Sequence, residues 1–147
     1  MDIQLGRSKV VRRAYGIDEI ALVPGGRTVD PEVTDTRWSI GGIEREIPII
    51  ASAMDGVVDV GMAVNLSRLG ALGVINLEGV QTRYEDPNSV LDRIASVGKD
   101  EFVPLMQEIY SRPVQESLIR KRIQDVKAQG GIAAVSGTPV AALRFGK

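Results

Sequence analysis

The residues best suited to chemistry lie at the end of an apolar run that begins at Ile47. Ser52 offers a hydroxyl that can bond a phosphate or a sugar, and Met54 offers a soft apolar surface for a planar base. Their neighbours are small, so a ligand can approach the backbone closely. Asp55 follows, and we favour a purely structural role for its carboxylate as the N-cap of the next helix.

Two further polar groups occur where later apolar runs end. Asn76 and Glu78 follow the second run. Both could contact a ligand. The simpler interpretation is that the asparagine side chain hydrogen-bonds to the backbone of its own loop. The third run ends in a small-residue turn whose backbone N–H groups can hold a phosphate: Ser136, Gly137 and Thr138. Neither group specifies a reaction by itself.

Parallel strands are needed to bring these residues to one edge. Residues 47–53 are almost continuously apolar or small, which is typical of a strand covered on both faces. Residues 73–77 predict a second strand, and between the two strands apolar residues recur at helical spacing: Val58, Met62, Leu66 and Leu69. This order indicates a right-handed βαβ unit, whose ligands bind beyond the carboxyl ends of the strands.

A helical excursion is predicted for residues 78–130, which are too many for a single crossover. Asp86 and Pro87 mark the start of its first helix. Asp100 is the expected cap of a second helix, and a third helix follows Pro113. In the third helix Ile119, Ile123 and Val126 are expected to face inward, whereas the basic residues Arg120, Lys121 and Arg122 are expected on a solvated face.

The remaining elements are a hairpin before the first strand and a strand and helix after the excursion. Gly41 and Gly42 separate two short runs and predict the hairpin. Residues 132–136 predict a third buried strand, and residues 140–145 predict the start of another helix. Three parallel strands would leave both edges of the sheet open, so we expect the chain to be part of a longer protein.

Composition excludes several function classes. The 147 residues include 0 Cys and 0 His, so disulfides, thiolate nucleophiles, imidazole catalysis and most zinc sites are impossible within this chain. The net charge of −1 and the 4% aromatic content do not favour nucleic acid. The sequence also predicts no membrane span and no signal peptide, and we therefore expect a cytoplasmic protein.

Taken in order, the motifs resemble those of the IMP dehydrogenase and GMP reductase family of purine nucleotide oxidoreductases. The matching segments are residues 15–24 (YGIDEIALVP), 35–37 (DTR), 47–55 (IPIIASAMD), 62–63 (MA) and 70–75 (GALGVI). They cover most of residues 15–77. The chain is most similar to the bacterial branch related to IMP dehydrogenase that lacks CBS domains, in which helices follow the second strand.

The resemblance implies an α/β fold, namely the N-terminal part of a (β/α)8 TIM barrel preceded by a short hairpin. Residues 1–46 would be an N-terminal extension, and residues 47–147 the first part of the barrel. Residues 78–130 would be a helical insertion in place of the CBS domains. Ser52 and Met54 match family positions that contact the nucleotide. The expected partners are a purine nucleotide (IMP, GMP or XMP) and identical subunits in a homotetramer or octamer.

The family's reaction transfers hydride at purine C2 to or from NAD or NADP, and its catalytic cysteine lies later in the barrel. The phosphate-binding glycines and the monovalent-cation loop also lie later. This chain therefore offers no catalytic residue and no metal ligand, and no cofactor contact can be named in it. At residues 76–77 IMP dehydrogenases commonly carry histidines beside the cofactor, whereas this chain has Asn76 and Leu77.

Three functions are consistent with the resemblance. The replaced histidines and the missing CBS pair favour a GMP reductase, which converts GMP and NADPH to IMP and ammonia. The alternative is an IMP dehydrogenase, which oxidises IMP to XMP with NAD. A third hypothesis is a non-catalytic fragment or nucleotide-binding module, and on its own the 147-residue chain is expected to be inactive because it contains 0 Cys.

Overall fold

The computed structural model describes residues 2–146, and its contacts divide the chain into two compact units between Asp35 and Thr36. The first unit contains the antiparallel hairpin of β1 (Asp2–Leu5) and β2 (Lys9–Arg12), which the sequence analysis did not predict. Two short 3₁₀ helices follow, η1 (Ile17–Glu19) and η2 (Pro31–Val33). The division at residue 46 inferred from the resemblance stays a prediction.

The second unit begins with the predicted hairpin, β3 (Trp38–Ile40) and β4 (Ile43–Arg45). Its turn is made by Gly41 and Gly42, whose φ angles of 56° and 80° lie in the left-handed region that favours glycine. The Trp38 indole donates a hydrogen bond of 2.7 Å to the Ile47 carbonyl, which ties the hairpin to the segment that leads into the sheet.

The predicted parallel sheet is confirmed, with strand order β5 (Ile50–Ala51), β6 (Leu72–Asn76) and β7 (Ala134–Ser136). The first strand is shorter than predicted, and within residues 2–146 it is not covered on both faces. Ile49 and Ile50 are 55% and 48% exposed, and the Ile49 N–H turns back to the Ile47 carbonyl. Within the described residues β5 pairs only with β6, so it is a short edge strand.

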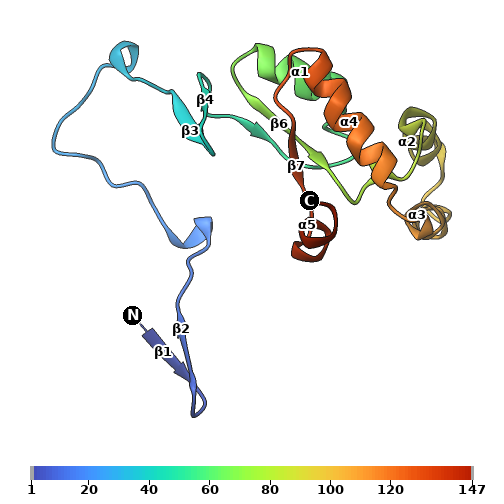
Figure 1. Ribbon diagram of the computed structural model, residues 1–147. Helices are drawn as coiled ribbons and strands as arrows, with labels where there is room; N and C mark the ends of the chain where they lie inside the picture. The colour runs from blue at the N-terminus through green and yellow to red at the C-terminus, as the bar shows by residue number, and fades with distance from the viewer. Residues whose placement is uncertain (1, 147) are drawn as a thin grey trace. The chain divides into compact units, whose positions relative to one another are not determined.

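Helix α1 (Val60–Arg68) connects β5 to β6 and lies beside α4 (Glu116–Ala128), as Figure 1 shows. The core between these elements is formed by five buried residues: Val58, Ala63, Val64, Ile75 and Val126. A Cβ on Gly73 would lie 2.9 Å from the Cα of Ala63, so this glycine allows α1 to pack closely on β6.

The predicted buried face of this helix is partly wrong. Val58 is buried, but it precedes the helix, because Asp59 is the N-cap. Met62 and Leu69 are 41% and 65% exposed. The close approach to Gly73 turns small Ala63 toward the sheet, and this rotation carries Met62 toward the surface.

The helical excursion is confirmed and consists of η3 (Val80–Thr82), α2 (Pro87–Ser96), α3 (Phe102–Ser111) and α4. Asp86 caps α2 as predicted, since its carboxylate accepts from two backbone N–H groups of the first turn. The predicted cap at Asp100 is wrong: α3 begins after Glu101, whose side chain makes no capping bond. A second apolar cluster joins these elements through Val80, Val90, Leu105 and Ile109.

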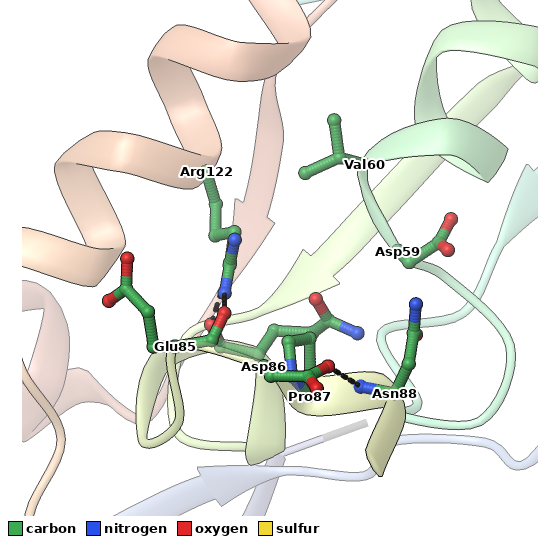
Figure 2. A pocket seen from close by; sticks show the side chains of 8 residues that line it. Asp59, Val60, Glu85, Asp86, Pro87, Asn88 and Arg122 are labelled. Carbon is green, nitrogen blue, oxygen red and sulfur yellow. Dashed lines mark hydrogen bonds between the residues drawn. The ribbon is translucent and has the colours of Figure 1, made fainter. Parts of the chain in front are cut away.

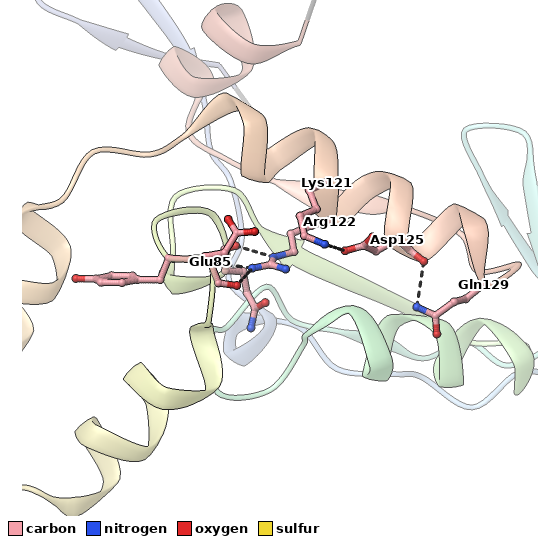
Figure 3. A network of polar contacts seen from close by, with 7 residues as sticks. Glu85, Lys121, Arg122, Asp125 and Gln129 are labelled. Atoms are coloured by element: carbon pink, nitrogen blue, oxygen red, sulfur yellow. Dashed lines mark hydrogen bonds and ion pairs between the residues drawn. The ribbon is translucent and has the colours of Figure 1, made fainter.

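The expectation of a solvated basic face on α4 holds for Arg120 and Lys121 but is wrong for Arg122. Arg120 and Lys121 pair with acidic residues one turn away. Arg122 is 8% exposed and donates to the carbonyls of Gln81, Tyr84 and Glu85 at 2.9, 3.1 and 2.8 Å (Figure 3).

The last element is α5 (Pro139–Phe145), which was predicted and is capped by the Thr138 hydroxyl. None of the helices within residues 2–146 has the length and apolar character that a membrane crossing requires.

We expect Arg122→Leu to lower the free energy of unfolding by about 2–4 kcal/mol. The substitution removes the donor to three carbonyls and leaves the Gln81 carbonyl buried without a partner. Arg120→Leu is the matched control. It breaks only an exposed pair with Glu116 and should change the free energy by less than about 0.5 kcal/mol. Urea unfolding measures both, and equal losses would contradict the buried role of Arg122.

Candidate functional site

The carboxyl ends of β5, β6 and β7 lie at one edge of the sheet because the three strands are parallel. The predicted site residues follow these ends directly, in loops that begin at Ser52, after Asn76 and at Gly137. Parallel pairing therefore brings together the three segments that the sequence singled out.

Ser52 and Met54 are both exposed in the loop after β5, and Met54 retains 54% of its accessible surface. The loop is compact, because the Met54 carbonyl accepts hydrogen bonds from the N–H groups of Val57 and Val58 at 2.9 and 3.0 Å. Val58 anchors this turn in the core with 1% exposure. The two side chains are thus open to a ligand on a fixed turn, and their contact with a nucleotide stays a prediction.

Asp55 has a different role from the predicted helix cap. The N-cap of α1 is Asp59, whose carboxylate accepts from the Met62 N–H at 2.7 Å. Asp55 turns instead to the helical excursion, where its Oδ2 accepts from the Val80 N–H at 2.9 Å and from the Tyr110 hydroxyl at 2.5 Å. One carboxylate therefore joins the loop after β5 to η3 and α3.

Gly79 makes this arrangement possible. A Cβ at residue 79 would lie 1.7 Å from Oδ1 of Asp55, so any side chain there would occupy the space of the carboxylate. Oδ1 is buried and has no hydrogen-bond partner among the described residues. The close packing of Gly79 explains why water does not reach this oxygen.

Tyr110 is the donor that the sequence analysis missed. Burial and the hydrogen bond to Asp55 raise the pKa of the Tyr110 hydroxyl to about 12, while the guanidinium of Arg83, 5.6 Å from the ring centre, acts in the opposite direction. The phenol is therefore protonated, and remains a donor, throughout the pH range in which proteins ordinarily work. Its partner lies 55 positions away in the chain, and no local pattern connects the two.

The ends of β6 and β7 are tied to each other by side chains. The Asn76 amide oxygen accepts from the Glu78 N–H at 3.0 Å. The Glu78 carboxylate accepts from the Thr138 N–H at 2.7 Å and from the Thr138 hydroxyl at 3.2 Å. These bonds support the interpretation in which Asn76 satisfies loop backbone, and they give Glu78 a structural role as well.

The polar side chains at the end of β6 are already engaged within the protein. The Asn76 amide and the Glu78 carboxylate each accept hydrogen bonds from backbone N–H groups. We therefore assign no cofactor contact to them. Within the described residues, acidic side chains do not gather in a group of three that could hold a metal ion.

A pocket of about 390 Å³ lies where the N-termini of α1 and α2 meet α4 (Figure 2). It is lined by Asp59, Val60, Gln81, Glu85, Asp86, Pro87, Asn88 and Arg122. Most of its charged groups already act in the fold, since Asp59 and Asp86 cap helices and Arg122 binds carbonyls. We assign no ligand to this pocket.

We expect Gly79→Ala to lower the melting temperature by at least several degrees, because its methyl group must displace the Asp55 carboxylate. Gly98→Ala is the control, since a Cβ at residue 98 meets open space. Adding Asp55→Ala to Gly79→Ala should recover part of the loss, because the clash is removed. Thermal unfolding of the unmodified protein, the two Gly→Ala variants, Asp55→Ala and the double variant tests this, and additive losses in the double variant would contradict the steric argument.

The profile of the IMP dehydrogenase / GMP reductase domain matches residues 14–138. An uncharacterized oxidoreductase of Mycobacterium leprae is 30% identical over 142 residues, which are 93% of this chain and 38% of that protein. The inosine-5′-monophosphate dehydrogenase of Methanocaldococcus jannaschii is 43% identical over 65 residues, 44% of this chain and 13% of that enzyme.

A solved structure gives the same result. The IMP dehydrogenase/GMP reductase-like protein of Corynebacterium glutamicum superimposes with a TM-score of 0.78 at 25% identity, over 99% of this chain and 40% of that one. The chain thus spans about two fifths of the length of such relatives. The profile match covers most of the chain and includes the loop of Ser52 and Met54. The chain therefore belongs to the IMP dehydrogenase / GMP reductase domain family.

Proposed function

We propose that this chain is the nucleotide-binding N-terminal part of an oxidoreductase that acts at C2 of a purine nucleotide with NAD or NADP. The family match over residues 14–138 is the observation that carries the proposal. The exposed positions of Ser52 and Met54 beside the end of a parallel strand support it from the structure.

In this proposal β5, β6 and β7 are the first three strands of a (β/α)8 barrel, and the helices of residues 78–130 take the place of a CBS pair. The parallel order of the strands and the helical crossover of α1 agree with this assignment. The complete protein would be a homotetramer or octamer that binds IMP, GMP or XMP.

The residues of this chain would bind and orient the nucleotide. The Ser52 hydroxyl would donate to a phosphate or sugar oxygen, and the Met54 side chain would pack against the face of the purine. Met54 begins the turn anchored by Val58, and the Ser52 carbonyl accepts from the Met54 N–H, so the purine would be held against a part of the chain that does not need to rearrange on binding.

The chemical step itself would use groups outside these 147 residues. A bound nicotinamide would supply the hydride acceptor or donor for C2. The resemblance assigns the covalent nucleophile to a cysteine, of which this chain has 0. In the reductive direction hydride is added at C2 and the amino group leaves as ammonia. In the oxidative direction hydride leaves C2 and water supplies the new oxygen.

We take GMP reduction with NADPH as the first candidate direction, because Asn76 and Leu77 stand where IMP dehydrogenases commonly have histidines. IMP oxidation with NAD is the second candidate. It is favoured by the 43% identity, over 65 residues, to a protein named inosine-5′-monophosphate dehydrogenase.

Nucleotide binding to the full-length protein tests the roles of the two loop residues. We expect Ser52→Ala and Met54→Ala each to raise the dissociation constant of IMP or GMP about tenfold in calorimetry, since each removes about 1.4 kcal/mol of contact. Met62→Ala is the control, because Met62 is similarly exposed but lies on α1. A loss equal in all three variants would contradict the proposed contacts.

The direction of the reaction is tested by following nicotinamide absorbance in the full-length protein with both substrate pairs. We expect oxidation of NADPH with GMP and release of ammonia. Turnover of IMP with NAD, with no turnover of GMP, would establish the alternative. If neither pair reacts and neither nucleotide binds, the proposed function is wrong.

A further inference from the structure

We infer that Asp55 and Tyr110 form a positioning pair, through which the helices of residues 78–130 hold the nucleotide-binding loop of Ser52 and Met54 in its binding geometry. This inference rests on the proposed function. To the proposed binding residues it adds two that contact no nucleotide themselves. Through these two residues the helical segment would affect the affinity for the nucleotide.

The position of Asp55 in the chain allows it to orient Met54. It directly follows Met54, and it lies inside the turn closed by the bonds from Val57 and Val58 to the Met54 carbonyl. While Ser52 and Met54 are exposed, the Asp55 side chain points into the protein and accepts two hydrogen bonds there. Fixing this carboxylate therefore fixes the orientation of the residue that would contact the purine.

The first anchor of the carboxylate is η3. The N–H of Val80, the first residue of η3, has no partner within the turn, and Asp55 accepts from it across 25 positions of the chain. The turn that it caps is rigid, because Val80 is 0% exposed and the buried Thr82 hydroxyl donates to the Leu77 carbonyl at 2.7 Å. The loop after β5 is thus tied to the end of β6.

The second anchor is the end of α3. Ile109, beside Tyr110 in the chain, is 1% exposed in the apolar cluster that also contains Val80. The guanidinium of Arg83 lies over the Tyr110 ring, and its Nε donates to the Glu78 carbonyl at 3.0 Å. The Tyr110 hydroxyl is consequently held in place by its own helix and by the loop after β6.

This arrangement preorganises the loop for its ligand. Without the tyrosine hydroxyl, Asp55 keeps only the Val80 bond, and the loop gains conformations that binding must then select against. The expected result is weaker nucleotide binding. A purely structural bond of the same kind would affect stability alone.

Tyr84 provides a matched comparison for Tyr110. It lies in the same segment, its hydroxyl donates to the Ile109 carbonyl at 3.1 Å, and its ring packs beneath Arg112. Tyr110→Phe and Tyr84→Phe each remove one hydroxyl, and both should lower the melting temperature by a few degrees. Only Tyr110→Phe should raise the dissociation constant of IMP or GMP, by about five- to tenfold, in the full-length protein.

A double-mutant cycle then tests whether the two residues act as a pair. Asp55→Ala should weaken binding at least as much as Tyr110→Phe, and the double variant should bind no more weakly than Asp55→Ala alone. Amide exchange at residues 54–58 should be faster in Tyr110→Phe than in Tyr84→Phe.

The outcomes separate this inference from the proposed function. If the unmodified protein binds IMP or GMP and Tyr110→Phe binds as tightly as Tyr84→Phe, the positioning role is wrong and the proposed function stands. Additive effects in the double variant also overturn the pairing. If the unmodified protein binds neither nucleotide, both the proposed function and this inference fall.

Discussion

The turn of residues 79–85 is held by side chains at both of its ends, and much of the second unit is organised around it. Asp55 accepts from the N–H at its beginning, and Arg122 donates to the carbonyls of Gln81, Tyr84 and Glu85 toward its end. A short turn leaves these backbone groups without internal partners, so a carboxylate at the amino end and a guanidinium at the carbonyl end complement it. The buried charge of Arg122 and the half-buried charge of Asp55 are tolerated here because each side chain bonds to backbone groups.

The two charged residues link different parts of the fold to the same turn. Asp55 comes from the loop after β5, and Arg122 comes from the helix that leads to β7. The segment after β6 is therefore bonded both to the loop after β5 and to the helix that precedes β7. The bonds from Thr138 to Glu78 complete this arrangement at the β7 side. The strand-end edge is thus braced by side chains, and Ser52 and Met54 remain exposed upon it.

Local patterns predicted the elements of the sheet and the helices, whereas contacts distant in sequence escaped them. The Asp86–Pro87 start of α2 and the glycine turn between β3 and β4 are short-range signals with a direct physical cause. Asp55 was mistaken for a cap because its partners, Val80 and Tyr110, are 25 and 55 positions away. The burial of Arg122 had a signal in the sequence, since helical spacing places it on the face of Leu118 and Val126.

The Asp55–Tyr110 bond joins a part of the chain that carries motifs of the family resemblance to a part that lies outside those motifs. Asp55 belongs to the run of residues 47–55 that carries the resemblance, and Tyr110 belongs to the segment that, by the same resemblance, stands where IMP dehydrogenases have a CBS pair. The helices of residues 78–130 are more than a spacer, since Tyr110 supplies a donor to the half-buried Asp55 carboxylate beside the loop of Ser52 and Met54.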